Sequence, residues 1–220
     1  AKGEFVAGDV YPDGRTHPIW SPNKITGRWG SSRNHQNWTE GDPKKGIPNV
    51  RRQVVAPRGW LIVGFDMAQG EPRVMALYSG DPFLCKIFAE GRDIHGEFAR
   101  EWNKDFNALE RESDPWRVIR NVTKTLEYAA IYKAGPETAY KTLLKKGFGH
   151  IKFIDCAKAV DSLKSKIPVL MKWQDDQIAA VARPPHELRS ILGRRRCFPL
   201  GNAPPTDVVN FRVQAGLADV

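Results

Sequence analysis

The sequence has few cysteines and no long apolar run. Its three cysteines, Cys85, Cys156 and Cys197, lie far apart and form no CxxC pair. This spacing argues against a disulfide framework and a zinc site, and it is typical of a reducing compartment. No apolar stretch is long enough to cross a bilayer, and the N-terminal residues are polar and turn-rich rather than signal-like. We therefore expect a cytoplasmic protein without membrane contact.

Acidic residues are scarcer than basic ones, which gives the chain a positive balance. Among 220 residues, 34 are Lys or Arg and 25 are Asp or Glu, for a formal charge of +9. A positive surplus attracts polyanions over long distances, and basic proteins often bind nucleic acid. A basic surface with no specific partner would have the same composition, so charge alone leaves both interpretations open.

The apolar pattern divides the chain into a strand-rich first part and a helical remainder. Residues 1–50 are rich in Gly, Pro, Asn and Trp without a sustained period, which predicts loops and short strands. Residues 54–55 and 60–65 predict two strands joined by a turn. Apolar periodicity and Gly or Pro punctuation then predict a strand at 194–200 and helices at 71–79, 82–89, 95–102, 115–132, 136–146, 153–166, 168–182 and 207–220.

The first candidate site follows the second of these predicted strands. Asp66 ends an apolar run and precedes a turn, so rigid backbone would hold its carboxylate in place. Mg²⁺ requires oxygen ligands in tight octahedral geometry, and the carbonyl of Met67 could supply a second one. An Asp at this position is equally suited to capping the helix that follows. The residues alone leave a metal ligand and a helix cap as alternatives.

The second candidate site is a row of residues with a four-residue spacing. Arg120, Lys124, Tyr128 and Tyr132 would lie along one ridge of the predicted helix. Cations neutralise phosphates, and aromatic faces stack on bases. A nucleoside triphosphate has its charge at one end and its base at the other, so it would match this ridge. A solvated basic stripe beside core tyrosines would show the same spacing.

Both sites resemble motifs of A-family DNA polymerases, of the bacterial polymerase I or phage type. IVGFDMAQGEPRVMALYSGD resembles their palm motif, and RNVTKTLEYAAIY resembles the nucleotide-binding helix of their fingers. TGRWGSSRNHQN is similar to a segment that contacts the primer–template. GRDIHGEFA is similar to an element between palm and fingers, and NFRVQAGLADV to a template-side helix. These motifs follow the family's order from residue 26 to residue 220, so the resemblance covers nearly the whole chain.

The resemblance implies an α+β fold, with a polymerase palm built on a small antiparallel sheet and a mainly helical fingers subdomain. It implies palm over residues 1–80, fingers over 81–200 and a return toward the palm over 201–220. The implied reaction is nucleotidyl transfer from a dNTP to a primer 3′-hydroxyl, with two Mg²⁺ ions as cofactors. Primer–template DNA and dNTPs are the implied partners, in the cytoplasm of a bacterium or of a phage-infected cell.

The resemblance also implies roles for individual residues. Asp66 and Met67 would bind metal, Glu71 would exclude a 2′-hydroxyl, and Lys124 would hold the triphosphate and could protonate the leaving pyrophosphate. The implied nucleotide-binding residues are Gln69, Glu71, His95, Arg120, Lys124, Tyr128 and Tyr132. The implied DNA-binding residues are Arg28, Asn34, Gln36, Asn37, Arg73, Asn210 and Gln214. The basic runs 44–45 and 194–196 could touch phosphates or be simply solvated.

Several positions depart from the family pattern. Lys133 stands where a Gly usually follows the last tyrosine of the ridge, and Gly70 and Pro72 replace bulkier residues. Residues 1–220 contain no hairpin of the His-Asp-Glu type, which carries the family's second metal-binding aspartate. We therefore expect this chain to be inactive alone and to need an aspartate from outside it, for which a second polypeptide is one source.

Three other functions remain as alternatives. A non-catalytic, DNA-binding relic of polymerase ancestry would not need the second aspartate. A single-subunit RNA polymerase shares much of the palm, but Glu71 and its spacing from Gln69 argue against it. A nuclease would require several clustered carboxylates, and only Asp66 and Glu71 are candidates.

Overall fold

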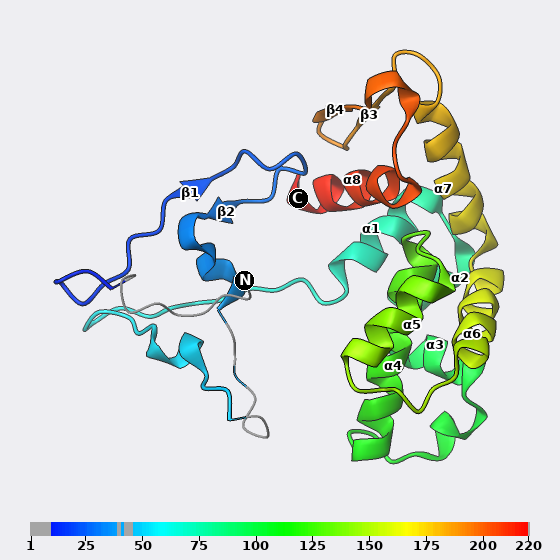
Figure 1. Ribbon diagram of the computed structural model, residues 1–220, viewed down its shortest axis with the longest axis horizontal. Coiled ribbons are helices and arrows are strands. Elements are labelled where there is room, and N and C mark those ends of the chain that lie inside the picture. The colour runs from blue at the N-terminus through cyan, green and yellow to red at the C-terminus, as the bar shows by residue number, and fades with distance from the viewer. Residues whose placement is uncertain (1–9, 39–40, 42–45, 220) are drawn as a thin grey trace. The chain divides into compact units, whose positions relative to one another are not determined.

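The computed structural model describes residues 10–38, 41 and 46–219, with the backbone alone at 33, 34 and 37. The chain forms two units, residues 1–68 and 69–220, and Figure 1 shows that the second carries the long helices. None of the helices in the described part of the chain combines the length and the apolarity that a bilayer crossing requires.

The first unit contains little regular structure. Strands β1 (Trp20–Ser21) and β2 (Gly30–Ser31) pair antiparallel, with Trp20 opposite Ser31. Two 3₁₀ helices follow, η2 (Ser32–Asn37) and η4 (Val50–Gln53). The side chain of Asn49 accepts a hydrogen bond from the Arg52 amide and so caps η4. The prediction of loops with short strands is confirmed here.

The prediction of two strands at 54–55 and 60–65 is wrong. The turn between them is present, because the Trp60 amide donates to the Pro57 carbonyl at 3.0 Å, but the flanking residues are irregular. Their apolar side chains lie in solvent: Leu61 is 87% exposed and Phe65 is 95% exposed. A strand is stable only when a neighbour accepts its backbone hydrogen bonds. No described segment pairs with this one, so β propensity alone does not produce a strand.

The second unit is a helical assembly with one small hairpin, and its helices match the predicted ones to within a few residues. Prolines or capping side chains mark most helix starts, and Gly80, in the left-handed region at φ 63°, ends the first helix. The hairpin pairs Glu187 with Cys197, and its second strand ends earlier than predicted, at the 3₁₀ turn η6. The elements are α1 (Gly70–Ser79), α2 (Pro82–Ala89), α3 (Ile94–Trp102), η5 (Lys104–Ala108), α4 (Asp114–Ile131), α5 (Pro136–Lys145), α6 (Phe153–Lys166), α7 (Pro168–Val181), β3 (Glu187–Arg189), β4 (Arg195–Cys197), η6 (Pro199–Gly201) and α8 (Pro205–Ala218).

Helix α4 lies at the centre of this unit. It packs against α3, α5 and α6, and Figure 1 shows it flanked by these helices. Val122, Leu126 and Ala130 are buried in the main core. Their spacing of four residues places them on one face, so the neighbouring positions are available for polar functions.

One buried carboxylate joins two helices that are distant in sequence. Asp81 is fully buried, and its Oδ1 accepts from the amides of Phe83 and Leu84 at the start of α2. Its Oδ2 accepts from the Leu170 amide at the start of α7, at 3.0 Å. Asp81 therefore satisfies orphan amides at two helix starts and fixes α7 against α2. Together, the mainly helical second unit and the two small antiparallel sheets confirm the predicted α+β class.

Candidate functional site

The predicted ridge forms on α4. The Tyr128 and Tyr132 rings stack with centroids 5.9 Å apart and planes inclined by 12°. The Lys124 ammonium lies 6.0 Å from the centroid of the Tyr128 ring. Arg120 lies at the other end of the row, with its guanidinium 5.6 Å from the centroid of the Trp116 ring. The ridge thus presents two cations followed by two stacked aromatic rings.

Glu71 connects the start of α1 to the end of this ridge. The Tyr132 hydroxyl donates to Glu71 Oε2 at 2.7 Å, across 61 positions of sequence. Burial raises the pKa of Tyr128, and the charges of Glu71 and Glu127 raise it further. Tyr128 therefore remains neutral at physiological pH, and a carboxylate lies beside the aromatic end of the ridge.

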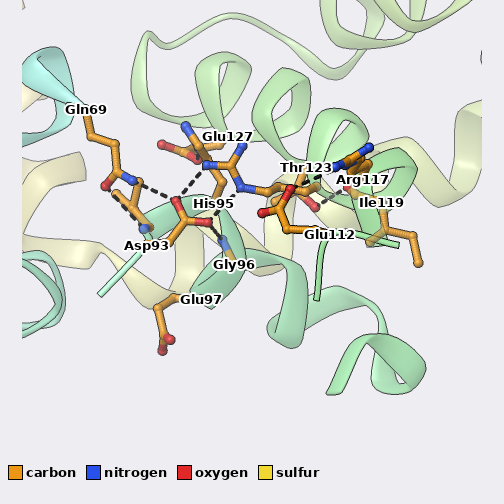
Figure 2. A network of polar contacts seen from close by, with 12 residues as sticks. Gln69, Asp93, His95, Gly96, Glu97, Glu112, Arg117, Ile119, Thr123 and Glu127 are labelled. Carbon is orange, nitrogen blue, oxygen red and sulfur yellow. Dashed lines mark hydrogen bonds and ion pairs between the residues drawn. The ribbon is translucent and has the colours of Figure 1, made fainter. Parts of the chain in front are cut away.

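Asp93 connects the start of α1 to the cationic end of the ridge, and Figure 2 shows its carboxylate beside the Gln69 side chain. It accepts a hydrogen bond from Gln69 Nε2 at 2.7 Å. It also accepts from Arg120 in a bidentate pair, with Nε at 2.8 Å and Nη2 at 3.0 Å. Partial burial alone would raise the pKa of Asp93, but the hydrogen bonds and charge of Arg120 outweigh burial and lower it. Asp93 is thus ionised and orients two of the predicted nucleotide-binding residues.

Gln69 is held in an unusual backbone conformation. Its φ of 57° and ψ of 37° lie in the left-handed region, which costs a non-glycine residue about 1 kcal/mol. The side chain is fastened at both ends: Nε2 donates to Asp93, and Oε1 accepts from the Ile94 amide at 3.3 Å. These contacts over-determine the position of Gln69 at the start of α1.

His95 lies on α3 and faces a buried carboxylate of α4. Its Nδ1 contacts Glu127 Oε2 at 2.5 Å, and both side chains are buried. Burial raises the pKa of Glu127, even though the hydrogen bond and charge of His95 oppose that rise. Within the described part of the chain, Glu127 Oε1 has no hydrogen-bond partner.

A cavity of about 350 Å³ borders the ridge between α4 and α5. Lys124 and Tyr128 line it from α4, and Lys146 lines it from the end of α5. The Lys146 ammonium donates to Thr125 Oγ1 at 2.8 Å. Burial, and then the charge of Lys124, lower the pKa of Lys146. Two ammonium groups with mutual repulsion make this side of α4 favourable for an anion.

The metal-ligand candidates belong to the first unit. Asp66 and Met67 are both exposed, three and two residues before Gln69. The N-cap of α1 is Gln69, so the alternative that Asp66 caps this helix is wrong. An exposed carboxylate and a carbonyl are oxygen ligands that suit Mg²⁺. No group of three or more His, Cys, Asp or Glu residues that could hold a metal ion gathers among the described residues.

The residues predicted to contact DNA are spread over both units. In the first unit Arg28 is exposed, while Gln36 donates to the Trp29 carbonyl at 2.9 Å. Asn34 and Asn37 belong to η2, but their side chains lie outside the described atoms. In the second unit Arg73 is exposed beside the Phe88 ring, and Asn210 and Gln214 lie one turn apart on α8.

The two basic runs differ in what the structure shows of them. Residues 44 and 45 lie outside the described residues. Each arginine of the run at 194–196 pairs with a carboxylate: Arg194 with Asp219, Arg195 with Glu187 and Arg196 with Asp207. The positive charge of this run is therefore partly neutralised.

Lys133 is accommodated by the backbone conformation that a glycine would adopt. Its φ is 56°, in the left-handed region, immediately after α4 ends. The ammonium donates to Asp175 Oδ1 at 2.7 Å, on α7. Lys133 thus occupies a backbone conformation that favours glycine.

Sequence reasoning missed Asp93 and Glu127. Asp93 carries one local signal, since an Asp directly before a helix is a common cap and its Oδ2 does accept from the Gly96 amide. Its contact with Arg120 spans 27 positions, and that of Glu127 with His95 spans 32. No periodicity reveals such pairs.

The chain is similar to known proteins along most of its length. The chain matches DNA polymerase family A over residues 10–219. It is 30% identical to the thermostable DNA polymerase I of Thermus aquaticus over 150 residues, which is 68% of this chain and 17% of that protein. The corresponding enzyme of Thermus caldophilus is 29% identical over 197 residues, which is 88% of this chain and 22% of that protein.

A solved structure has a similar fold. It is the POL domain of Pol1 from M. smegmatis in complex with DNA primer-template and dNTP, with a TM-score of 0.69 and 21% sequence identity. The match covers 96% of this chain and 37% of that one. The matched region thus spans about a fifth of the curated relatives and over a third of the solved polymerase domain.

Proposed function

This chain belongs to DNA polymerase family A, and from that premise we propose that it is the palm-and-fingers portion of an enzyme that copies a DNA template. The reaction is nucleotidyl transfer from a dNTP to a primer 3′-hydroxyl. The observation that carries the proposal is the ridge of α4, whose cationic end is bonded to Asp93 and whose aromatic end is bonded to Glu71. This arrangement fits a triphosphate at one end and a sugar and base at the other.

Arg120 and Lys124 bind the triphosphate in this proposal. A guanidinium has five N–H donors, and Asp93 occupies two of them. The others are available to phosphate oxygens, in an orientation that Asp93 has already selected. Positioned cations of this kind supply much of the catalysis in phosphoryl transfer, because they stabilise the charge that develops in the transition state. Lys124 is in addition the proton donor to the departing pyrophosphate.

The aromatic end of the ridge binds the sugar and the base. Tyr128 contacts both, and Tyr132 packs beneath the template base. Glu71 occupies the space that a 2′-hydroxyl would need, and its hydrogen bond from Tyr132 keeps the carboxylate in that place. Gln69 supports the same wall, since its side chain is bonded to Asp93 and to Ile94.

Asp66 and the Met67 carbonyl are the proposed ligands for Mg²⁺. When bound, two such ions activate the attacking oxygen and stabilise the leaving oxygens. One carboxylate is too few for this geometry, so a second comes from outside residues 1–220, on the same polypeptide or on a partner. The 220-residue chain by itself is therefore proposed to be inactive.

Primer–template DNA is the proposed macromolecular partner, and the bacterial or phage-infected cytoplasm is the proposed location. Arg28, Asn34, Gln36 and Asn37 contact it from the first unit. Arg73, Asn210 and Gln214 contact it from the second. The net charge of +9 supports this assignment, because polyanion binding depends on such a surplus.

The test is nucleotide binding by the full protein that contains this chain. Arg120→Ala removes a ridge cation, and Arg117→Ala removes an exposed arginine one turn earlier on the same helix. We expect Arg120→Ala to weaken dNTP binding at least about tenfold and Arg117→Ala to have little effect. Equal effects of the two variants would contradict the proposal that the ridge of α4 binds the nucleotide. A protein that binds primer–template but never extends it would favour the non-catalytic relic instead.

A further inference from the structure

Glu127 is a charged residue in an unusual place. It lies on α4 between Lys124 and Tyr128, yet it is 0% exposed and faces α3 rather than the ridge. An isolated buried carboxylate is strongly disfavoured, so its single partner must account for its presence. That partner is His95, one of the proposed triphosphate-binding residues.

A purely structural role explains Glu127 poorly. Asp81 is equally buried, but amides of two helices bond both of its oxygens. Glu127 uses one oxygen, and its Oε1 has no donor within the described part of the chain. A buried ion pair is rarely more stable than apolar residues of similar volume. The pair therefore makes the protein less stable than apolar residues would, and its effect is to place a carboxyl group against His95.

The geometry restricts the protons of the pair. A ring nitrogen and a carboxylate oxygen at 2.5 Å require a proton between them, on Nδ1 or on Oε2. If this proton is on Oε2, the neutral ring carries its own proton at Nε2. If it is on Nδ1 in an imidazolium, Nε2 is protonated as well. Both of these states hold two protons on the pair. Nε2 becomes a bare acceptor only if the pair loses one of them and keeps the single proton between Nδ1 and Oε2.

The surroundings favour the protonated pair when an anion arrives. His95 Nε2 has no hydrogen-bond partner among the described residues, so a ligand that reached it would meet no competing protein contact. A phosphate oxygen accepts hydrogen bonds, so it stabilises the states with a proton on Nε2. The other charges that act on the pair are Asp93 at the start of α3 and Arg120 and Lys124 on α4. Arg120 and Lys124 are themselves proposed triphosphate ligands.

We propose that Glu127 is a positioning residue that holds His95 with Nε2 as a hydrogen-bond donor to the triphosphate of the incoming nucleotide. The proposal rests on the proposed function, because it needs a triphosphate bound along α4. Glu127 does not touch the nucleotide. It acts by keeping a proton on the pair and by fixing the ring orientation, as a carboxylate commonly does for a functional histidine.

The first test is ¹⁵N NMR of the His95 ring in the full protein, with dATP as the probe and without primer. In the wild type with dATP, we expect Nε2 to be protonated. Glu127→Leu removes the partner without adding a polar group, and we expect the ring then to hold a mixture of its two tautomers. An unprotonated Nε2 in the nucleotide-bound wild type, or a spectrum that Glu127→Leu leaves unchanged, would overturn the proposal.

The second test separates positioning from folding. We expect Glu127→Leu to raise the KM for dNTP about five- to tenfold and to change kcat less than about twofold, because the lost contact is made to bound nucleotide in the ground state as well. Glu127→Gln keeps a donor or acceptor toward Nδ1 and should recover part of the loss. Asp81→Asn, at the other buried carboxylate, should lower Tm and leave KM unchanged.

Two further variants show whether a negative result contradicts this inference or the proposed function itself. His95→Ala should raise KM as much as Glu127→Leu does, and the double variant should be no worse than His95→Ala alone. If Arg120→Ala weakens dATP binding but Glu127→Leu does not, this inference fails and the proposed function stands. If Arg120→Ala has no effect either, the proposed function itself fails.

Discussion

The two units of this chain differ in what holds their functional residues. In the second unit, side chains from α1, α3 and α4 bond to one another, so that Gln69, Asp93 and Arg120 are fixed by contacts within the unit. In the first unit, Asp66 follows a segment whose apolar side chains are exposed and whose backbone joins no sheet. The nucleotide-binding candidates are thus preorganised by their own unit, whereas the metal-ligand candidate has no comparable support within the described residues.

The largest expected effect concerns Asp66, which has fewer supporting contacts than the nucleotide-binding candidates. Asp66→Asn in the full protein should lower kcat about a thousandfold, because an amide replaces the negative charge that a metal ion requires. Thermal stability should be unchanged, because Gln69 and not Asp66 is the N-cap of α1. Single-turnover primer extension and thermal melting would check both statements. Asp13→Asn, at another exposed acid of the first unit, is the control and should behave like the wild type.

The next-largest effect tests how much Asp81 contributes to the stability of the second unit. Asp81→Ala removes caps from α2 and α7 together and leaves buried amides unpaired, so we expect a loss of about 2–4 kcal/mol in the free energy of unfolding. Urea denaturation followed by circular dichroism measures it. Asp114→Ala, at an exposed acid in the first turn of α4, should cost under about 0.5 kcal/mol. Equal losses would mean that the double cap adds nothing.

Glu71 tests the aromatic end of the ridge. Glu71→Ala should raise the use of ribonucleotides relative to deoxyribonucleotides by about tenfold or more, because it vacates the space that a 2′-hydroxyl needs. The measurement is the ratio of kcat/KM for a matched pair of nucleotides. Tyr132→Phe removes the hydrogen bond to the carboxylate and should relax the discrimination less. If Glu71→Ala left the discrimination unchanged, the proposal that Glu71 lies beside the sugar would be wrong.

Tyr128 offers a finer test of the same end. Its hydroxyl can replace the polar contact of a missing 3′-hydroxyl, so the full enzyme should accept dideoxynucleotides nearly as well as normal ones. Tyr128→Phe should restore discrimination by about tenfold, which corresponds to about 1.4 kcal/mol. Single-turnover incorporation of both substrates by both proteins decides the matter. A constant ratio would show that Tyr128 serves the core instead.

Lys133 should give the smallest effect. At φ 56° a glycine avoids the left-handed penalty, so Lys133→Gly should be more stable than Lys133→Ala by about 1 kcal/mol. Both variants lose the ion pair with the exposed Asp175, so its small contribution cancels in the comparison. Thermal melting of the two variants gives the difference. If the alanine variant were the more stable one, the turn would not require this conformation.

The helices could be predicted from the sequence because their signals are local. Proline at a first turn, Asp or Ser before it and Gly after the end mark where many of the helices begin or end, and these residues lie within the helix or next to it. The irregular structure at 54–55 and 60–65 could not be predicted, because strand formation depends on a pairing partner that periodicity does not reveal. Spacing by four likewise predicted that Arg120, Lys124, Tyr128 and Tyr132 would be neighbours on α4. The partners that orient them, Asp93 and Glu71, come from distant positions.

The backbone of Gln69 has a mechanical consequence. Its left-handed conformation is retained by hydrogen bonds to Asp93 and Ile94, so the torsion angles at the junction of the two units are coupled to the arginine that Asp93 also holds. A triphosphate that draws Arg120 away from Asp93 would weaken one of the two hydrogen bonds that hold Gln69 in this conformation. The left-handed conformation of Gln69 would then depend on the hydrogen bond from the Ile94 amide alone.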